Sequence, residues 1–265
     1  MIKRLILACL LVGIFAIPSF AQEPLMINTD TEDISLTDDL DIAKAQVEKY
    51  PDNAEAHFNL AIALSRTSYV EQSIKELRKT KKLIRKPENA GLIDKKIDEY
   101  KEILKHNPDN ASVNNIRYRL AFTHYLKAYY ISKEIEKKEK AETLYTTSQQ
   151  KKKDVGIDLF SNQKLIKIDK DPQIKENLDQ SLSYFKELLK YDPNDSWAKV
   201  YYGFILAEQY DDFPKAKKLW NEVVKQDPSN PAPHLFLGEA KIKEGNLKEG
   251  LLEITQAILL RSISN

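Results

Sequence analysis

Apolar residues recur at three- and four-residue intervals through most of the chain, as in Val70, Ile74 and Leu77. This spacing is typical of amphipathic helices that bury one face. Four polar joints interrupt the pattern. In each, a proline stops one helix, and an Asp, Asn or Ser follows that can cap the next. The pattern therefore predicts an all-α chain of helices joined in pairs. The joints are Tyr50–Asn53, Asn107–Asn110, Asp192–Asp195 and Asp227–Asn230.

The N-terminus has the order of a secretory signal peptide. Lys3 and Arg4 precede an apolar run from Leu5 to Ile17, and the small residue Ala21 follows. The apolar run is shorter than the roughly 20 residues of a membrane-spanning helix. We therefore expect residues 1–21 to be removed and the protein to be exported, to the periplasm or outside the cell. An uncleaved membrane anchor is the alternative.

Cleavage would leave a chain without cysteine and with almost balanced charge. Cys9 is the only cysteine. Removal of Lys3 and Arg4 lowers the 41 basic residues to 39, against 40 acidic residues. Such a balance gives no global signal for nucleic acid or an anionic membrane as partner. The stability of the exported form would then come from burial without disulfides.

The distances between joints divide the helical region. Prolines 193 and 228 are 35 positions apart, whereas 57 positions separate prolines 51 and 108, and 85 separate prolines 108 and 193. The long intervals predict insertions into a regular array. We expect a disordered acidic leader at 22–39, a helical domain at 40–264, regular repeats at 194–228 and 229–264, and insertions at about 69–90 and 134–172.

The two regular units share small and large residues at fixed spacing. The first helix of each unit carries one small residue. The second helix carries a small residue, a large residue four positions later, and an aliphatic or small residue three positions after that. These are Gly203, Ala216, Trp220 and Val223 in one unit, and Gly238, Gly250, Ile254 and Ala257 in the other.

This pattern resembles the tetratricopeptide repeat (TPR), a helix-turn-helix of 34 residues. Ala61 and Ala121 occupy the first-helix small position in two weaker matches, whereas Lys241 replaces the tyrosine of the family pattern. The resemblance implies an α-α superhelical solenoid of TPR-like helix pairs. A small residue at each crossing lets two helices approach closely, and successive pairs bury one another's apolar faces.

The family resemblance also implies an interaction scaffold, in which first helices line a concave groove that holds a partner helix or peptide. A chaperone-like carrier of apolar segments in the periplasm is the alternative function. Large aromatic residues on a helix are more often core than binding surface, so a packed core is the competing interpretation. The predicted groove residues are Phe58, Ile62, Tyr118, Phe122, Tyr125, Val200, Phe204, Leu235 and Ile242.

A second apolar stripe follows the last joint. Leu252, Leu259 and Ile263 recur on one side of the final predicted helix. A solenoid normally ends in a helix with a polar outer face. The stripe therefore predicts a second interface, through which a homodimer or another protein would cover it. Curling of the last helix against its own pair is the competing interpretation.

The sequence offers no convergent chemistry, so we expect neither an enzyme nor a metal or other cofactor. His57, His106, His124 and His234 lack metal-ligand spacing, and no phosphate-binding loop or nucleophile motif occurs. His57 and His234 occupy the same place in two repeats, which predicts a packing role. We expect a protein or peptide partner, no nucleic acid and no membrane span after signal cleavage.

Two further stretches lie outside the regular repeats. Lys75–Lys86 is strongly basic, which is consistent with contact to an acidic partner or an anionic membrane surface, but more simply indicates a solvated helix face. Lys133–Lys153 is expected to be an exposed helical extension. Val155–Ile168 is apolar, and we expect it to pack back onto the solenoid and fill part of the groove.

Overall fold

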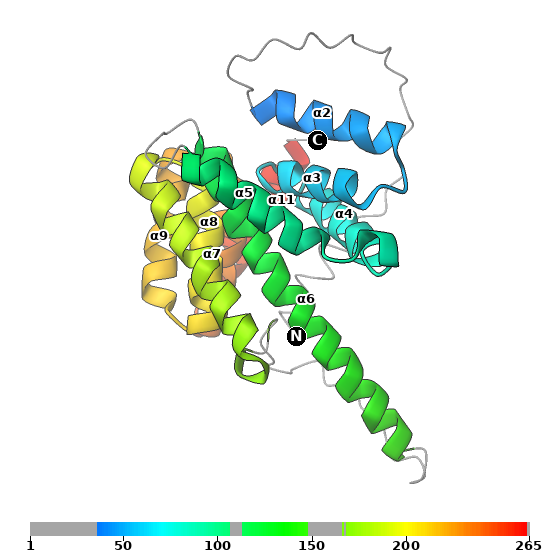
Figure 1. Ribbon diagram of the computed structural model, residues 1–265. Helices are drawn as coiled ribbons and strands as arrows, with labels where there is room; N and C mark the ends of the chain where they lie inside the picture. Colours follow the sequence, from blue (N-terminus) through cyan, green and yellow to red (C-terminus); the bar gives the residue numbers. More distant parts are fainter. Residues whose placement is uncertain (1–35, 107–112, 148–165, 167, 264–265) are drawn as a thin grey trace. The chain divides into compact units, whose positions relative to one another are not determined.

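The computed structural model describes residues 36–106, 113–147, 166 and 168–263, and every regular element among them is helical (Figure 1). The all-α prediction is confirmed for these residues. The signal-peptide prediction at 1–21 lies outside them. The helices are α2 (Leu36–Lys49), α3 (Ala54–Ser65), α4 (Val70–Leu83), α5 (Leu92–His106), α6 (Asn114–Thr147), α7 (Pro172–Tyr191), α8 (Ser196–Tyr210), α9 (Phe213–Gln226), α10 (Pro231–Lys243) and α11 (Leu247–Ile263), with short 3-10 turns η1 (Pro87–Asn89) and η3 (Ile168–Lys170).

Helix starts follow the predicted capping chemistry at three of the four joints. Asn53 accepts hydrogen bonds from the backbone N–H groups of Glu55 and Ala56 at 2.9 and 3.0 Å. Asp195 and Asn230 cap α8 and α10 in the same way. The joint at 107–110 lies outside the described residues. These side chains satisfy N–H groups that lack a partner within the helix, which fixes where each helix begins.

The chain divides into two compact units, with the described residues up to Thr80 in the first and those from Lys81 onward in the second. In the first unit, Leu60 and Leu64 of α3 pack against Ala43 of α2. Helix α2 begins at Leu36, so the helical part starts before the predicted boundary at residue 40.

Helix α4 is the direct partner of α3. The Ser73 hydroxyl donates a hydrogen bond to the backbone carbonyl of Ala61 at 2.7 Å, which holds the two helices at close range. The stretch 69–90, expected as an insertion, therefore contains the second helix of the first pair. The sequence interpretation missed this because Ser73 begins a weak version of the motif, with Leu77 and Thr80 at the large and aliphatic positions.

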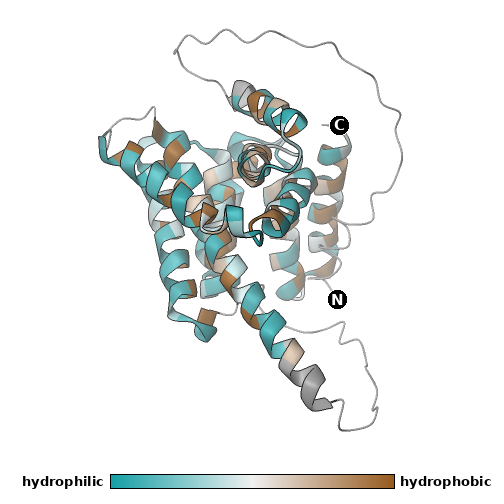
Figure 2. Ribbon diagram, turned by 45° about the vertical axis from the view of Figure 1, so that its right-hand side comes forward, coloured by the Kyte–Doolittle hydropathy of each residue, from teal (hydrophilic) through white to brown (hydrophobic). Residues whose placement is uncertain are grey.

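The second unit is a stack of three antiparallel helix pairs, with α5 added at one side. Helix α6 pairs with α7, α8 with α9 and α10 with α11, and α7 contacts α8 as α9 contacts α10. Figure 1 shows α7, α8 and α9 side by side, and the hydropathy colouring of Figure 2 shows polar and apolar positions alternating around the helices. This arrangement is an α-α solenoid, as the sequence predicted.

Two pairs of the second unit cross at small residues on both helices. The Ser181 hydroxyl donates to the Ala121 carbonyl at 2.7 Å, which repeats the Ser73–Ala61 contact of the first unit. At the α10–α11 crossing, a methyl group added to Gly238 would lie 2.8 Å from the carbonyl oxygen of Gly250. The prediction that small residues permit close helix approach is therefore confirmed.

Helix α6 is much longer than its partner. It runs continuously for 34 residues, against 20 in α7. The predicted helical extension from Lys133 is confirmed as far as Thr147. Of the apolar stretch 155–168, expected to pack back onto the solenoid, Ile166 is fully buried and Ile168 is half-buried. The rest of that stretch lies outside the described residues.

Candidate functional site

Aromatic side chains fill the interior of the second unit between the first helices of its pairs. Tyr201 of α8 is at the centre, with ring centroids 5.3 Å from Phe122 and 6.3 Å from Tyr118. Phe185 of α7 meets Tyr118 edge-on at 5.7 Å. Rings at these separations and tilts attract one another beyond the burial of their area. The cluster therefore packs α6, α7 and α8 against one another.

A second set of rings continues toward α10 and reaches the surface. Tyr125 of α6 and Phe204 of α8 are 6.1 Å apart, and Phe204 is 5.2 Å from Phe236 of α10. All three side chains are half-buried, as is the neighbouring Leu235. We name Tyr125, Phe204, Leu235 and Phe236 the aromatic row. Burial among the rings raises the pKa of the Tyr125 hydroxyl, so this residue stays uncharged.

The predicted groove residues separate into two groups. Phe58 and Ile62 belong to the first unit, and the other seven to the second. Ile242 is partly exposed, but its side chain approaches Gly250 of α11 and so takes part in the α10–α11 crossing. The half-buried members are Tyr125, Phe204, Leu235 and Ile242, and the buried ones are Phe58, Ile62, Tyr118, Phe122 and Val200.

Burial limits what the buried members can do. A side chain such as Phe58 or Tyr118, with no exposed area, contributes packing energy within the free protein and offers no surface to a partner. The competing interpretation in the sequence, that large aromatics form a core, therefore applies to these five residues. Binding stays a prediction for the members that keep exposed area.

Two aromatic residues were absent from the predicted site. Tyr201 and Phe236 precede the Tyr202-Gly203 and Leu237-Gly238 motifs by one position, so they occupy the same place in successive repeats. This shared register was a usable signal. It was missed because the groove prediction used other positions along each first helix, carried over from the resemblance.

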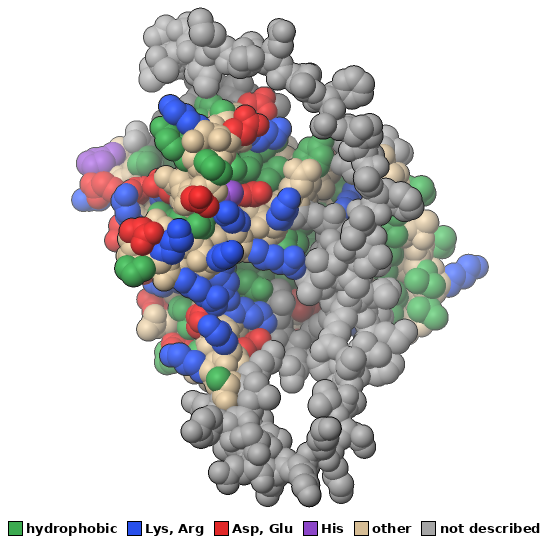
Figure 3. All heavy atoms as spheres, turned by 90° about the vertical axis from the view of Figure 1, so that its right-hand side faces the viewer, with side chains coloured by type: hydrophobic (Ala, Val, Ile, Leu, Met, Phe, Trp, Pro, Cys, Tyr) green, Lys and Arg blue, Asp and Glu red, His purple; other side chains and the backbone are tan. Residues whose placement is uncertain are grey.

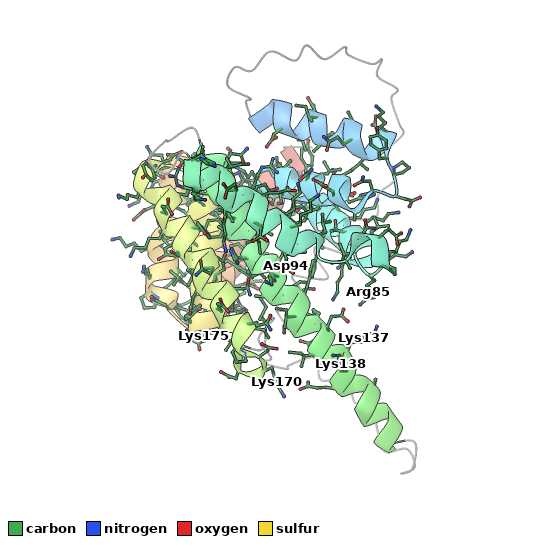
Figure 4. The ribbon with its side chains drawn as sticks, viewed as in Figure 1. Arg85, Asp94, Lys137, Lys138, Lys170 and Lys175 are labelled. Atoms are coloured by element: carbon green, nitrogen blue, oxygen red, sulfur yellow. The ribbon has the colours of Figure 1, made fainter. Side chains whose placement is uncertain are left out.

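Basic side chains are numerous on the face shown in Figure 3. Several basic side chains of the second unit form ion pairs with α6. Oε1 of Glu134 on α6 forms ion pairs with the Arg85 guanidinium at 2.7 Å and with the Lys81 Nζ at 3.5 Å. Figure 4 labels Arg85 and Lys170 at either side of α6, and Lys170 binds Glu139 of that helix at 2.6 Å. These pairs support the simpler interpretation of the charged runs, a solvated surface with ion pairs.

Three of the four histidines contact other helices. His57 of α3 lies 2.5 Å from a carboxylate oxygen of Glu76 on α4, and His234 of α10 lies 2.7 Å from Glu253 on α11. The equivalence of His57 and His234 is confirmed, because each pairs with a glutamate 19 residues later across its own helix pair. His124 is buried and bonds to Asn177 at 2.8 Å.

Over the described ranges, no three or more His, Cys, Asp or Glu side chains gather where they would share a metal ion. The same part of the chain contains no helix with the length and apolar character needed to cross a membrane.

The fold and the aromatic row define an α-solenoid whose first helices carry neighbouring, partly exposed rings. No protein-family model matches the chain, and comparison with curated proteins finds no match. Among solved structures, it is similar to TTC0263, a thermophilic TPR protein in Thermus thermophilus, with 14% identity over 85% of this chain and 82% of that one, and a TM-score of 0.43.

Two other solved structures show similar values. YrrB, a TPR protein with an unusual peptide-binding site, has 16% identity over 83% of this chain and 93% of that one, with a TM-score of 0.29. MamA has 10% identity over 86% and 89%, with a TM-score of 0.35. Likeness at this level assigns no site, so the helix-pair contacts described above carry the structural argument.

Proposed function

We propose that this protein is an exported interaction scaffold that binds a helix or an extended apolar segment of another protein along the aromatic row. The supporting observation is the continuity of Tyr125, Phe204 and Phe236 across three successive first helices, with each of these residues only partly buried. Such a surface presents anchors at the spacing of stacked helices, which suits a partner longer than one helix turn.

The chemistry of the row favours an apolar segment. Its rings are large and held by their neighbours, so little side-chain freedom is lost on binding, and aromatic residues dominate the energetics of many interfaces. Glu208 is also on α8, but Lys243 of α10 pairs with it at 3.2 Å. Partner specificity would therefore come from the shape and spacing of apolar anchors.

The test places a photo-crosslinking amino acid at position 204 and irradiates the cells that produce the protein, so that a bound partner is captured. We expect a discrete protein adduct, and we expect Leu235→Asp in the same chain to reduce it at least about tenfold. The physical reason is that desolvating an unpaired carboxylate in an apolar contact costs more than the roughly 1.4 kcal/mol that tenfold represents. Phe58 and Phe122 are unsuitable for such changes because they are buried.

Ile103 provides the matched control, because it is an exposed apolar residue on α5. A crosslinker there should give no equivalent adduct, and Ile103→Asp should leave the adduct from position 204 unchanged. The same adduct from both positions, or none from position 204, contradicts the proposal. A mixture of many short peptides or lipids at position 204 would instead support the carrier function.

A further inference from the structure

The outer face of α11 is apolar where the earlier second helices are polar. The helices align at the small residue of each crossing, which is Ser181 in α7, Ala216 in α9 and Gly250 in α11. The compared positions lie two, five and nine residues later, and all of them are exposed. They hold Ser183, Lys186 and Lys190 in α7, Lys218, Asn221 and Lys225 in α9, and Leu252, Thr255 and Leu259 in α11.

This contrast shows that the repeat itself does not require apolar residues at these positions. Lys218 and Lys225 stay exposed although the pair α10–α11 is stacked against α9. The matching face of α11 would thus stay open even if another helix pair followed in the same manner. Two leucines at these positions need another explanation.

The exposed apolar surface of α11 extends over two edges. Leu251 and Ile258 are seven residues apart on one edge, and Leu252 and Leu259 are seven apart on the other. Figure 2 shows hydrophobic positions recurring along the helix that leads to the C-terminus. Leu247, Leu251, Leu252, Ile258 and Leu259 are 58, 50, 61, 55 and 52% exposed, respectively. A contiguous patch of this kind usually marks an interaction site.

Two small residues lie along the middle of this patch. The hydroxyl of Thr255 donates to the Leu251 carbonyl at 2.8 Å, and that of Ser262 donates to the Leu259 carbonyl at 2.7 Å. Their polar groups are therefore satisfied within the helix, so a second helix could cover them without leaving an unpaired donor. Their small size allows a close approach between the leucine edges.

The pattern is also symmetric about Thr255. Leu251 and Leu252 lie four and three residues before it, and Ile258 and Leu259 lie three and four residues after it. When two such helices pair in antiparallel orientation around Thr255, the leucines on one side of each face the isoleucine and leucine on the other. A two-fold contact between identical chains requires this kind of self-complementary surface.

From this symmetry we infer that the occupant of the patch is a second copy of the chain, paired through antiparallel α11 helices around Thr255. Lys248 is the one charged side chain of α11 that falls along the middle of the patch, near its N-terminal end. Antiparallel pairing places the two copies of Lys248 at opposite ends of the contact, where they do not repel each other. This inference is independent of the aromatic row.

The first test is the mass of the purified protein in solution, measured by light scattering over a dilution series. We expect a dimer, and we expect Leu252→Lys with Leu259→Lys to give a monomer with unchanged helix content. These changes copy the lysines of α9. The matched control, Lys218→Ser with Lys225→Ser, alters the same positions one repeat earlier and should stay dimeric.

The second test locates the two-fold axis and needs no destabilising change. In a Cys9→Ser background, Thr255→Cys should form a disulfide between two chains, because equivalent residues at such an axis are near each other. Asn221→Cys, the equivalent position in α9, should not. A wild-type monomer at every concentration, an oligomer larger than a dimer, or equal crosslinking by both cysteines overturns the inference.

Discussion

His124 is a buried histidine held in one arrangement. The Asn177 side-chain oxygen can only accept a hydrogen bond, so Nδ1 of His124 donates to it and carries the hydrogen. Nε2 of the neutral ring is therefore unprotonated. Nε2 is buried and has no hydrogen-bond partner. Protonation there would place a charge in an apolar site. Burial is the main reason that the pKa of His124 lies below its ordinary value.

This geometry predicts a loss of stability on acidification. The unfolded chain binds the proton near the ordinary value of 6.5, and the folded chain binds it only at lower pH. The contribution of neutral His124 is therefore full above the unfolded pKa and declines as pH falls through it. We expect His124→Gln, which keeps a donor for Asn177, to reduce the decrease in melting temperature over this range. An identical pH profile in the variant would show that His124 is not responsible.

At the scale of elements, the contact where two helices cross determines which helices form a pair. Hydroxyl-to-carbonyl bonds hold the α3–α4 and α6–α7 crossings, and paired glycines serve the same purpose between α10 and α11. Each device brings two backbones close together while leaving polar groups satisfied. The second helix of these three pairs is consequently defined by its small residue more than by its length or charge.

The α10–α11 crossing predicts an unfavourable effect of a usually favourable substitution. Alanine in place of glycine stabilises an unhindered helix by about 1 kcal/mol. At Gly250, however, the new methyl group would lie 2.7 Å from the Gly238 carbonyl oxygen, which is backbone and cannot rotate away. We expect Gly250→Ala to lower the free energy of unfolding by about 1–3 kcal/mol, measured by urea denaturation.

Ser183→Ala, at an exposed site on α7, is the control for this measurement and should change stability by less than about 0.5 kcal/mol. A Gly250→Ala variant as stable as the wild type would mean that α11 can move away from α10 at little cost. The dimer inferred for α11 would then be built on a movable helix.

For the whole molecule, the compartment depends on residues 1–21. We expect the protein recovered from a bacterial host to begin at Gln22, as determined by mass spectrometry of its N-terminal peptide. Signal peptidases require a small residue at the end of the signal, so Ala21→Leu should accumulate the precursor. Glu23→Gln, beyond the cut, should be processed normally. A wild-type chain that keeps its first residues in the membrane fraction would identify an uncleaved anchor.

The sequence by itself determined the helical class, the joints between helices and the caps at Asn53, Asp195 and Asn230, because these depend on periodicity and on bonds between residues a few positions apart. It also identified Gly203 and Gly238 as crossing points. It assigned α4 to an insertion, because Ser73 does not reveal that its hydroxyl reaches Ala61.

Only the tertiary structure decided which large side chains are core and which are surface. Tyr118 and Phe204 look alike as aromatic residues on first helices, yet one is fully buried and the other keeps exposed area. The difference arises from neighbours on other helices: Phe185 and Tyr201 surround Tyr118. Burial depends on contacts between segments far apart in the chain, which local spacing does not encode.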